Sequence, residues 1–228
     1  MSAAVAQPEE IVRAISLLFN DDDVVEVRIP KTRAGTVSGY FDDHTVLAKE
    51  ILAADRKYGA SGIYYVLNQI DPALLGRGFN RLREHSEYTT ADSNILRRRW
   101  LPIDLDPVRP SGVSSSDEEH TAALQRARVI ASDLKTEWGQ PILADSGNGA
   151  HLLYRIDLLN DMDALAYVAS TLQELDRRYS DTAVKVDITS ANAARIWKAY
   201  GSVARKGDSI PGRPHRISRI LEVGNGNA

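Results

Sequence analysis

Hydrophobic residues recur at helical spacing near the start of the chain and then at the spacing of strands. Ile11, Ile15 and Leu18 repeat with the helical period behind Pro8, which suits a first turn, so a helix is predicted over residues 8–19. The segments that follow predict strands over 24–29, 35–41 and 62–67, and a helix over 43–57 that ends at Gly59. This part of the chain therefore predicts an α/β module.

The second half has a more regular order of elements. A strand over 100–106 precedes Ser116-Asp-Glu-Glu119, a capping box that opens an amphipathic helix. Strands over 141–144 and 150–156 flank a glycine loop, Asn160 is positioned to cap a second helix, and 184–188 predicts a last strand. The order is β-α-β-β-α-β.

This order is that of ferredoxin-like domains, which include RNA-recognition modules and polymerase palms. We therefore expect an α+β protein in which an N-terminal α/β module, residues 1–98, packs on a ferredoxin-like or RRM-like catalytic half, residues 99–228. The boundary is placed at the end of an irregular connection over 71–98, which contains Pro72, Gly76 and Gly78.

Composition narrows the function classes. The 228 residues are 43% hydrophobic and 26% charged, as in ordinary globular proteins, and they include no cysteine. Disulfides, thiolate catalysis and cysteine-based zinc sites are excluded. No long apolar run and no secretory signal is present, so we expect a cytoplasmic protein without a membrane partner.

The charge is unevenly distributed along the chain. The net charge is only −3, yet residues 195–219 contain seven Arg and Lys residues and one acid, Asp208. This region predicts an anionic partner, with a solvated basic surface as the alternative.

Asp104 and Asp106 form the strongest chemical signal. Side chains alternate across a strand, so both carboxylates project from one face, where they repel each other unless a cation lies between them. Oxygen ligands favour Mg²⁺ or Mn²⁺. The alternative is a strand that ends in a turn at Asp106-Pro107.

The ferredoxin-like order predicts which segments meet this pair. The first strand is antiparallel to the third and fourth, so its end neighbours the loop Ser146 to His151 and also Asp187. Asp187 would complete a three-carboxylate cage for two metal ions, while Gly147 and Gly149 would let backbone amides approach phosphate oxygens. Taken singly, Gly-Asn-Gly is usually a hairpin turn and a lone histidine is usually structural. Their convergence favours the functional interpretation.

The sequence around these residues resembles three motifs of the archaeo-eukaryotic primase superfamily. They are Leu-Pro-Ile-Asp104-Leu-Asp-Pro, then Ser146-Gly-Asn-Gly-Ala-His151, then Val-Asp187 followed by Arg195-Ile-Trp-Lys198-Ala-Tyr-Gly-Ser and Arg205-Lys-Gly. The resemblance extends over most of the chain and is greatest to the primase-polymerase domains of plasmids, phages and CRISPR-associated proteins.

The resemblance implies roles for individual residues. Asp104, Asp106 and Asp187 would be the metal ligands and catalytic residues, with two Mg²⁺ or Mn²⁺ ions. The nucleotide would be bound by Ser146, Gly147, Asn148, Gly149, His151, Arg195, Lys198 and Lys206. The expected partners are single-stranded or primer-template nucleic acid and an NTP or dNTP. Relatives often continue into a helicase or a C-terminal primase domain, so such a domain of a longer protein is a further candidate partner.

The expected activity is nucleotidyl transfer, with a metal-dependent nuclease or a non-catalytic single-strand binder as alternatives. No Gly-x-x-x-x-Gly-Lys-Ser/Thr motif is present, so no helicase or ATPase activity is expected, and without cysteines the usual zinc insert is missing. Two further sets of residues each have two interpretations. Tyr40, Phe41, Tyr64 and Tyr65 would stack on bases or lie in the core, and Arg97 to Arg99 would follow a template or form a solvated turn.

Overall fold

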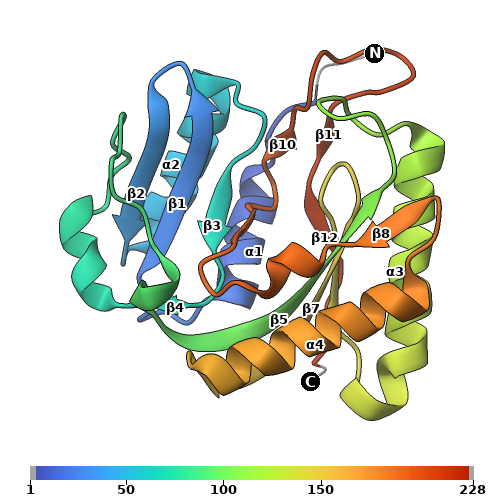
Figure 1. Ribbon diagram of the computed structural model, residues 1–228. Coiled ribbons are helices and arrows are strands. Elements are labelled where there is room, and N and C mark those ends of the chain that lie inside the picture. The colour runs from blue at the N-terminus through green and yellow to red at the C-terminus, as the bar shows by residue number, and fades with distance from the viewer. Residues whose placement is uncertain (1–3, 226–228) are drawn as a thin grey trace.

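The computed structural model of the protein describes residues 4–225, which form an α+β structure built on two main sheets (Figure 1). The predicted α+β class is confirmed. The helices are α1 (Pro8–Leu18), α2 (His44–Tyr58), α3 (Asp117–Trp138) and α4 (Met162–Tyr179), with short 3₁₀ turns at Pro72–Arg77, Asp92–Asn94 and Ile188–Ala191. The strands are β1 (Val25–Thr32), β2 (Gly35–Phe41), β3 (Tyr64–Val66), β4 (Gln69–Ile70), β5 (Ile95–Pro107), β6 (Ile142–Asp145), β7 (Ala150–Leu159), β8 (Val184–Val186), β9 (Ile196–Lys198), β10 (Val203–Ala204), β11 (Arg216–Ile217) and β12 (Arg219–Glu222).

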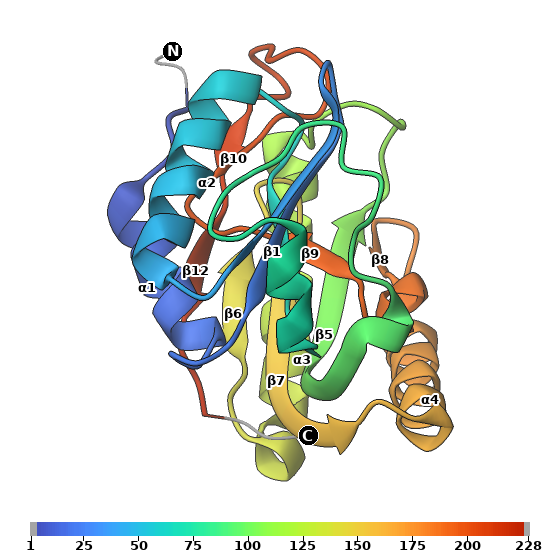
Figure 2. The same cartoon turned by 90° about the vertical axis from the view of Figure 1, so that its left-hand side faces the viewer.

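The smaller sheet has the strand order β2-β1-β3-β9 and lies against α1 and α2 (Figure 2). Local signals explain α2. The Asp43 carboxylate accepts hydrogen bonds from the amides of Thr45 and Val46 at its start, and Gly59 ends it in the left-handed region at φ +50°. Strand β9 belongs to the second half of the sequence, so the two halves share this sheet. The predicted division at residue 98 stays a prediction.

The larger sheet positions the site. Its strand order is β12-β6-β7-β5-β4. β8 pairs with the end of β5, on the edge opposite β7, which β4 occupies at the start of β5. β5 runs antiparallel to both β7 and β8, with Asp104 opposite His151 and Leu105 opposite Val186. The end of β5 therefore lies between the start of β7 and the end of β8.

The two faces of the larger sheet have different partners. Leu101, Ile103 and Leu105 on one face pack against α3 and α4. The alternate residues of β5 face the N-terminal module, where Trp100 joins the core formed by α1, α2 and the smaller sheet. Asp104 and Asp106 share this second face, because side chains two residues apart on a strand point the same way. The fold thus places both carboxylates at the junction of the two sheets.

Three expectations were wrong in detail. Strand β5 begins at Ile95, so Arg97 to Arg99 lie in the sheet and form no turn. The cap of α4 is Asp161, whose carboxylate accepts a hydrogen bond from the amide of Ala164. The Asn160 side chain instead donates to the carbonyls of Asp92 and Ile95. Strand β8 ends at Val186, because Asp187 begins a 3₁₀ turn.

No helix in residues 4–225 is both long enough and apolar enough to span a membrane.

Candidate active site

A cavity of about 350 Å³ opens at the junction of the two sheets. It contains side chains from the end of β5, the β6–β7 loop, the turn after β8, β9 and the loop after β10. The residues predicted for the site that line it are Asp104, Asp106, Ser146, Asn148, His151, Asp187, Arg195, Lys198 and Lys206. The segments predicted to converge are therefore together in the structure, while their chemical roles stay predictions.

Asp104 is held by a chain of aromatic and polar groups. The His151 Nε2 atom lies 3.4 Å from Asp104 Oδ1, and His151 Nδ1 lies 2.8 Å from the hydroxyl of Tyr200. The Trp197 indole donates to the same hydroxyl over 3.1 Å. Because an indole can only donate, the Tyr200 hydrogen is available for Nδ1, which leaves the Nε2–H of His151 directed at Asp104. His151 thus supports the carboxylate.

The two strand carboxylates have opposite electrostatic shifts. Burial raises the pKa of Asp104, but His151, Lys206 and Arg195 outweigh burial and hold this pKa below its usual value. For Asp106, burial and the negative charge of Asp104 raise the pKa, against the opposing effects of Lys206 and Arg109. These shifts are those of a crowded pair of like charges, which a cation would relieve.

Asp187 lies beside this pair but is already partnered. Its backbone amide donates to the Asp104 carbonyl over 2.8 Å. One carboxylate oxygen accepts from Thr189, and the other pairs with Arg195 at 2.7 Å. Asp187 therefore both caps the 3₁₀ turn and holds Arg195.

The donor set fits a divalent cation in part. Asp104 and Asp106 supply carboxylate oxygens on one face, and their contacts with His151 and Arg109 are 3.4 Å and 3.3 Å long. Across the described part of the chain, no three His, Cys, Asp or Glu residues form a ready metal-binding cluster. Asp187 would have to exchange Arg195 to join the pair, so the three-carboxylate cage stays a prediction.

The β6–β7 loop presents Ser146 and Asn148 to the cavity, whereas Gly147 and Gly149 serve packing in this structure. A Cβ on Gly147, where φ is +90°, would lie 2.6 Å from the Cβ of Ala204. A Cβ on Gly149 would lie 2.3 Å from the carbonyl oxygen of Leu105. Both glycines therefore permit a close approach of backbones, and the predicted contact of their amides with phosphate stays a prediction.

We expect Gly149→Ala to destabilise the protein by about 1–3 kcal/mol, because the new methyl group must displace the backbone of β5. Urea unfolding followed by circular dichroism measures this change. Gly76→Ala is the matched control, since no atom lies within 4 Å of a Cβ built there. Equal midpoints for the two variants would contradict the packing role.

The start of α3 anchors the glycine loop through residues that the sequence did not single out. Asp145 Oδ1 accepts from the amide of Gly147 over 2.6 Å and lies 2.8 Å from His120 Nε2. Asn148 Oδ1 accepts from the amide of Ser115 over 2.9 Å, which leaves its NH₂ group for the cavity. The packing of α3 against the sheet brings these groups together, so no local motif marks them.

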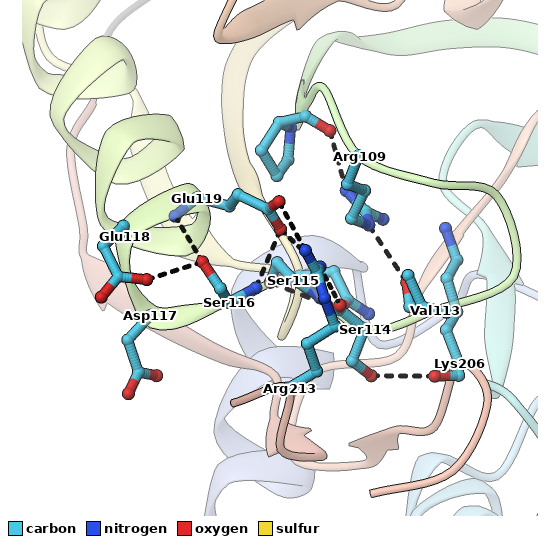
Figure 3. A network of polar contacts seen from close by, with 12 residues as sticks. Arg109, Val113, Ser114, Ser115, Ser116, Asp117, Glu118, Glu119, Lys206 and Arg213 are labelled. Atoms are coloured by element: carbon cyan, nitrogen blue, oxygen red, sulfur yellow. Dashed lines mark hydrogen bonds and ion pairs between the residues drawn. The ribbon is translucent and has the colours of Figure 1, made fainter. Parts of the chain in front are cut away.

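The same end of α3 also holds the basic loop that follows β10 (Figure 3). Ser114 Oγ donates to the carbonyl of Lys206, and Arg213 forms two hydrogen bonds with Glu119. Arg109 donates to Asp106 and to the carbonyls of Pro107 and Val113. Ser114 and Glu119 therefore tie the basic loop to the start of α3, and Arg109 ties the end of β5 to the segment just before α3.

Lys198 is the most perturbed cation in the cavity wall. Its Nζ atom donates to the carbonyl of Val203 over 3.0 Å and lies 5.6 Å from the centre of the Tyr64 ring. Burial lowers the pKa of Lys198 to about 7, although the nearby Asp55 opposes the shift. The Lys198 side chain is thus an equilibrium mixture of charged ammonium and neutral amine near pH 7.

The aromatic candidates separate clearly. Tyr64 lines the cavity, and burial together with the charges of Asp104 and Asp106 raises the pKa of its hydroxyl. Tyr40, Phe41 and Tyr65 are buried in the core. Of the four, only Tyr64 is placed to contact a ligand in this cavity.

The three consecutive arginines do not line the cavity. Arg97 pairs with Asp157, Arg99 pairs with Asp23, and Arg98 is buried with its guanidinium bonded to the Ala191 carbonyl and to Asn160. The expectation of a solvated turn was therefore wrong.

Comparison with known proteins gives structural relatives alone: no family model matches the chain, and no curated protein sequence is similar to it. The AEP domain of the cyanophage S-2L primase-polymerase superposes with a TM-score of 0.54 at 13% identity, covering 96% of this chain and 92% of that chain. Primase RepB′ gives a TM-score of 0.49 at 10% identity, covering 95% of this chain and 56% of that one. The polymerase domain of Mycobacterium tuberculosis ligase D, solved in complex with DNA, gives 0.46 at 14% identity, covering 92% and 79%.

Identities this low establish a shared fold and leave the activity to be argued from the site. The superposition on the cyanophage domain covers nearly all of both chains. The chain therefore shares its fold with this primase-polymerase AEP domain, as the sequence resemblance predicts for the fold.

Proposed function

We propose that the protein is a DNA primase-polymerase, a template-directed nucleotidyltransferase that adds nucleotides to a 3′-hydroxyl and releases pyrophosphate. The observation that carries the proposal is the composition of the cavity. Three carboxylates lie at one end of β5, and three cationic side chains and two polar loop residues line the same 350 Å³. Nucleotidyl transfer needs this combination, because a triphosphate must be bound while negative charge develops on it.

The carboxylates would hold two divalent ions, Mg²⁺ or Mn²⁺, between Asp104, Asp106 and Asp187. When bound, such ions favour deprotonation of an attacking hydroxyl and neutralise the phosphate charge. The chain's own residues would do the rest. Arg195, Lys198 and Lys206 stabilise the triphosphate, and Ser146 and the NH₂ group of Asn148 donate to its oxygens. The Nε2–H of His151 keeps Asp104 oriented.

The antiparallel pairing of β6, β7, β5 and β8 supports a ferredoxin-like description of this half. In the proposed reaction, a primer and template approach the open side of the cavity and a nucleotide lies along the loop of Ser146 and Asn148. The proposed partners also include a helicase or a further primase domain.

A product-length assay tests the proposed function. The protein is incubated with a 5′-labelled primer annealed to a template and Mn²⁺, with and without nucleotides, and the products are separated on a denaturing gel. Lengthening that depends on nucleotides is expected. Shortening would instead indicate a nuclease, and unchanged strands that are retarded on a native gel would indicate a binding module.

The pKa of Lys198 gives a prediction on pH. Its value of about 7 means that the side chain loses its charge as pH rises through 7. We therefore expect the KM for the nucleotide to rise several-fold between pH 6 and pH 8.5, since the charged form binds a triphosphate better. Initial rates of extension measured across this range provide the test.

The variant Lys198→Met is the control for this prediction. It keeps an unbranched side chain of similar length and removes the titrating group, so its KM should be higher and nearly independent of pH. A wild-type pH dependence that persists in Lys198→Met would assign the effect to another group.

A further inference from the structure

A second and larger cavity lies away from the site described above. Its volume is about 700 Å³, and its polar wall is formed by Asn20, Gln69, Arg97, Arg99, Arg155 and Asp157. None of these residues lines the first cavity. The two cavities therefore have no lining residue in common.

The strand register places the two cavities on the same face of the larger sheet. Arg155 lies opposite Trp100, and His151 lies opposite Asp104. The two pairs are four positions apart along β5, which corresponds to about 13 Å of strand. Leu153, which lies between His151 and Arg155 on β7, and Trp100 are both buried in the core. The arginine cavity thus opens at the far end of the junction between the sheets.

Positive charge dominates this wall. Three guanidinium groups face one lining carboxylate, that of Asp157, which pairs with Arg97 at 2.6 Å. The Asp157 side chain is 74% exposed. An ion pair exposed to this extent contributes little to stability, so an incoming anion can replace Asp157 at little cost.

Hydrogen-bond donors in the cavity are left without acceptors. The Arg155 guanidinium lies over the Trp100 ring at 4.4 Å and gives one hydrogen bond, to the Leu17 carbonyl. The Arg99 Nε atom is buried and has no hydrogen-bond partner among the described residues, although its Nη2 pairs with Asp23 at 3.3 Å. Each guanidinium carries five N–H donors, and a buried donor without a partner calls for an acceptor at that place.

The amide side chains add to this excess. Gln69 lies on β4, half-buried, and Asn20 follows α1. Both line the cavity, and neither side chain forms a hydrogen bond within residues 4–225. A ligand that offers several acceptor oxygens and negative charge would satisfy all of these groups at once.

We propose that this arginine cavity binds a phosphate group, either of a free nucleotide or pyrophosphate or of a nucleic-acid strand. Guanidinium forks match the geometry of phosphate oxygens, and the open wall admits a ligand larger than one phosphate. The inference goes beyond the proposed function and does not depend on it, because it concerns residues that take no part in the first cavity.

The test reads the cavity directly through the reactivity of Arg155, whose side chain is solvent-exposed. Phenylglyoxal modifies accessible arginines, and mass spectrometry of peptides gives the rate at Arg155. The rate is measured in EDTA with increasing pyrophosphate, or with a single-stranded oligonucleotide that lacks a terminal phosphate. Gln69→Glu is the test variant, since it adds a negative charge at nearly constant volume. Gln173→Glu makes the same change at an exposed position of α4 and is the matched control.

The protection of Arg155 by each probe is measured on the wild-type protein, on Gln69→Glu and on Gln173→Glu. We expect at least a threefold slowing of modification in wild type and Gln173→Glu, and at least tenfold more probe for the same protection in Gln69→Glu. Protection by pyrophosphate assigns the cavity to free phosphates and nucleotides, while protection by the oligonucleotide alone assigns it to strand phosphates. No protection of wild type by millimolar probe, or identical curves for the two variants, overturns the proposal. Neither probe requires turnover, so the result can be read even if the protein does not extend a primer.

Discussion

Asp106→Ala and Asp104→Asn are each expected to lower the rate of primer extension by at least about a thousandfold, roughly 4 kcal/mol of barrier, while the fold stays intact. Both carboxylates point from β5 into the 350 Å³ cavity, where their oxygens are the natural ligands of a divalent ion. An amide or a methyl group cannot supply the charge that this ion needs. Single-turnover extension of a labelled primer gives the rate.

The structure indicates why these variants should fold. The Asp106 side chain is 46% exposed and its contact with Arg109 is 3.3 Å long, so truncation removes little packing. Asparagine at 104 keeps an acceptor for the Nε2–H of His151. A melting temperature within about 2 °C of wild type is expected for both variants, and Asp22→Ala, an exposed aspartate outside the cavity, is the control for activity. Near wild-type extension by a purified Asp104→Asn/Asp106→Ala double variant would refute the assignment.

Elements with strong local signals were predictable from the sequence. The capping box of Ser116 and Glu119 is present at the start of α3, with the serine side chain bound to the amide of Glu119 and the glutamate bound to the amide of Ser116. The Asp43 cap and the Gly59 end of α2 are equally local. Such signals depend on a few neighbouring residues, so no knowledge of the rest of the fold is needed.

Short strands and exact boundaries were not predictable in this way. β9 to β12 are two to four residues long, and β9 and β12 owe their existence to strands far away in sequence, β3 and β6. A segment of that length has no measurable alternation. The Arg97 to Arg99 segment likewise joins β5 because β7 extends to Leu159 and offers it a partner.

The candidate site shows the same division. Its acidic pair could be identified because two aspartates alternate on an apolar strand, and the meeting of three segments followed from the order of strands. The supporting contacts could not be identified. His120, Asp145, Tyr200 and Arg109 acquire their roles from side-chain distances set by register and by the packing of α3, and no spacing along the chain encodes these distances.

Asp55→Ala is expected to cost about 3–5 kcal/mol of unfolding free energy, the largest stability effect that we predict. Asp55 is a buried residue of α2 whose carboxylate accepts two hydrogen bonds from Arg205, at 2.9 Å and 2.7 Å, and one from the amide of Val203, at 3.1 Å. Its loss leaves a largely buried guanidinium and a backbone donor without partners. Chemical unfolding at pH 7 gives the free energy.

The pH dependence supplies an independent check on this pair. Burial raises the pKa of Asp55, but Arg205 and the Val203 amide outweigh burial and lower it below its usual value. A carboxylate with a depressed folded pKa contributes its stability above the unfolded value of about 4, and the contribution is lost as pH falls through the folded value. The advantage of wild type over Asp55→Ala should therefore shrink as pH falls below 4.

A double replacement separates the ion pair from the space that it fills. In Asp55→Leu/Arg205→Met both charges are removed and apolar groups take their place, so at least half of the lost stability should return. If the double variant is as unstable as Asp55→Ala, the carboxylate acts mainly through the Val203 amide, and β10 with the basic loop that follows depends on that single hydrogen bond. If it recovers, α2 holds the basic loop through charge, and the loss of Arg205 alone should be as costly as the loss of Asp55.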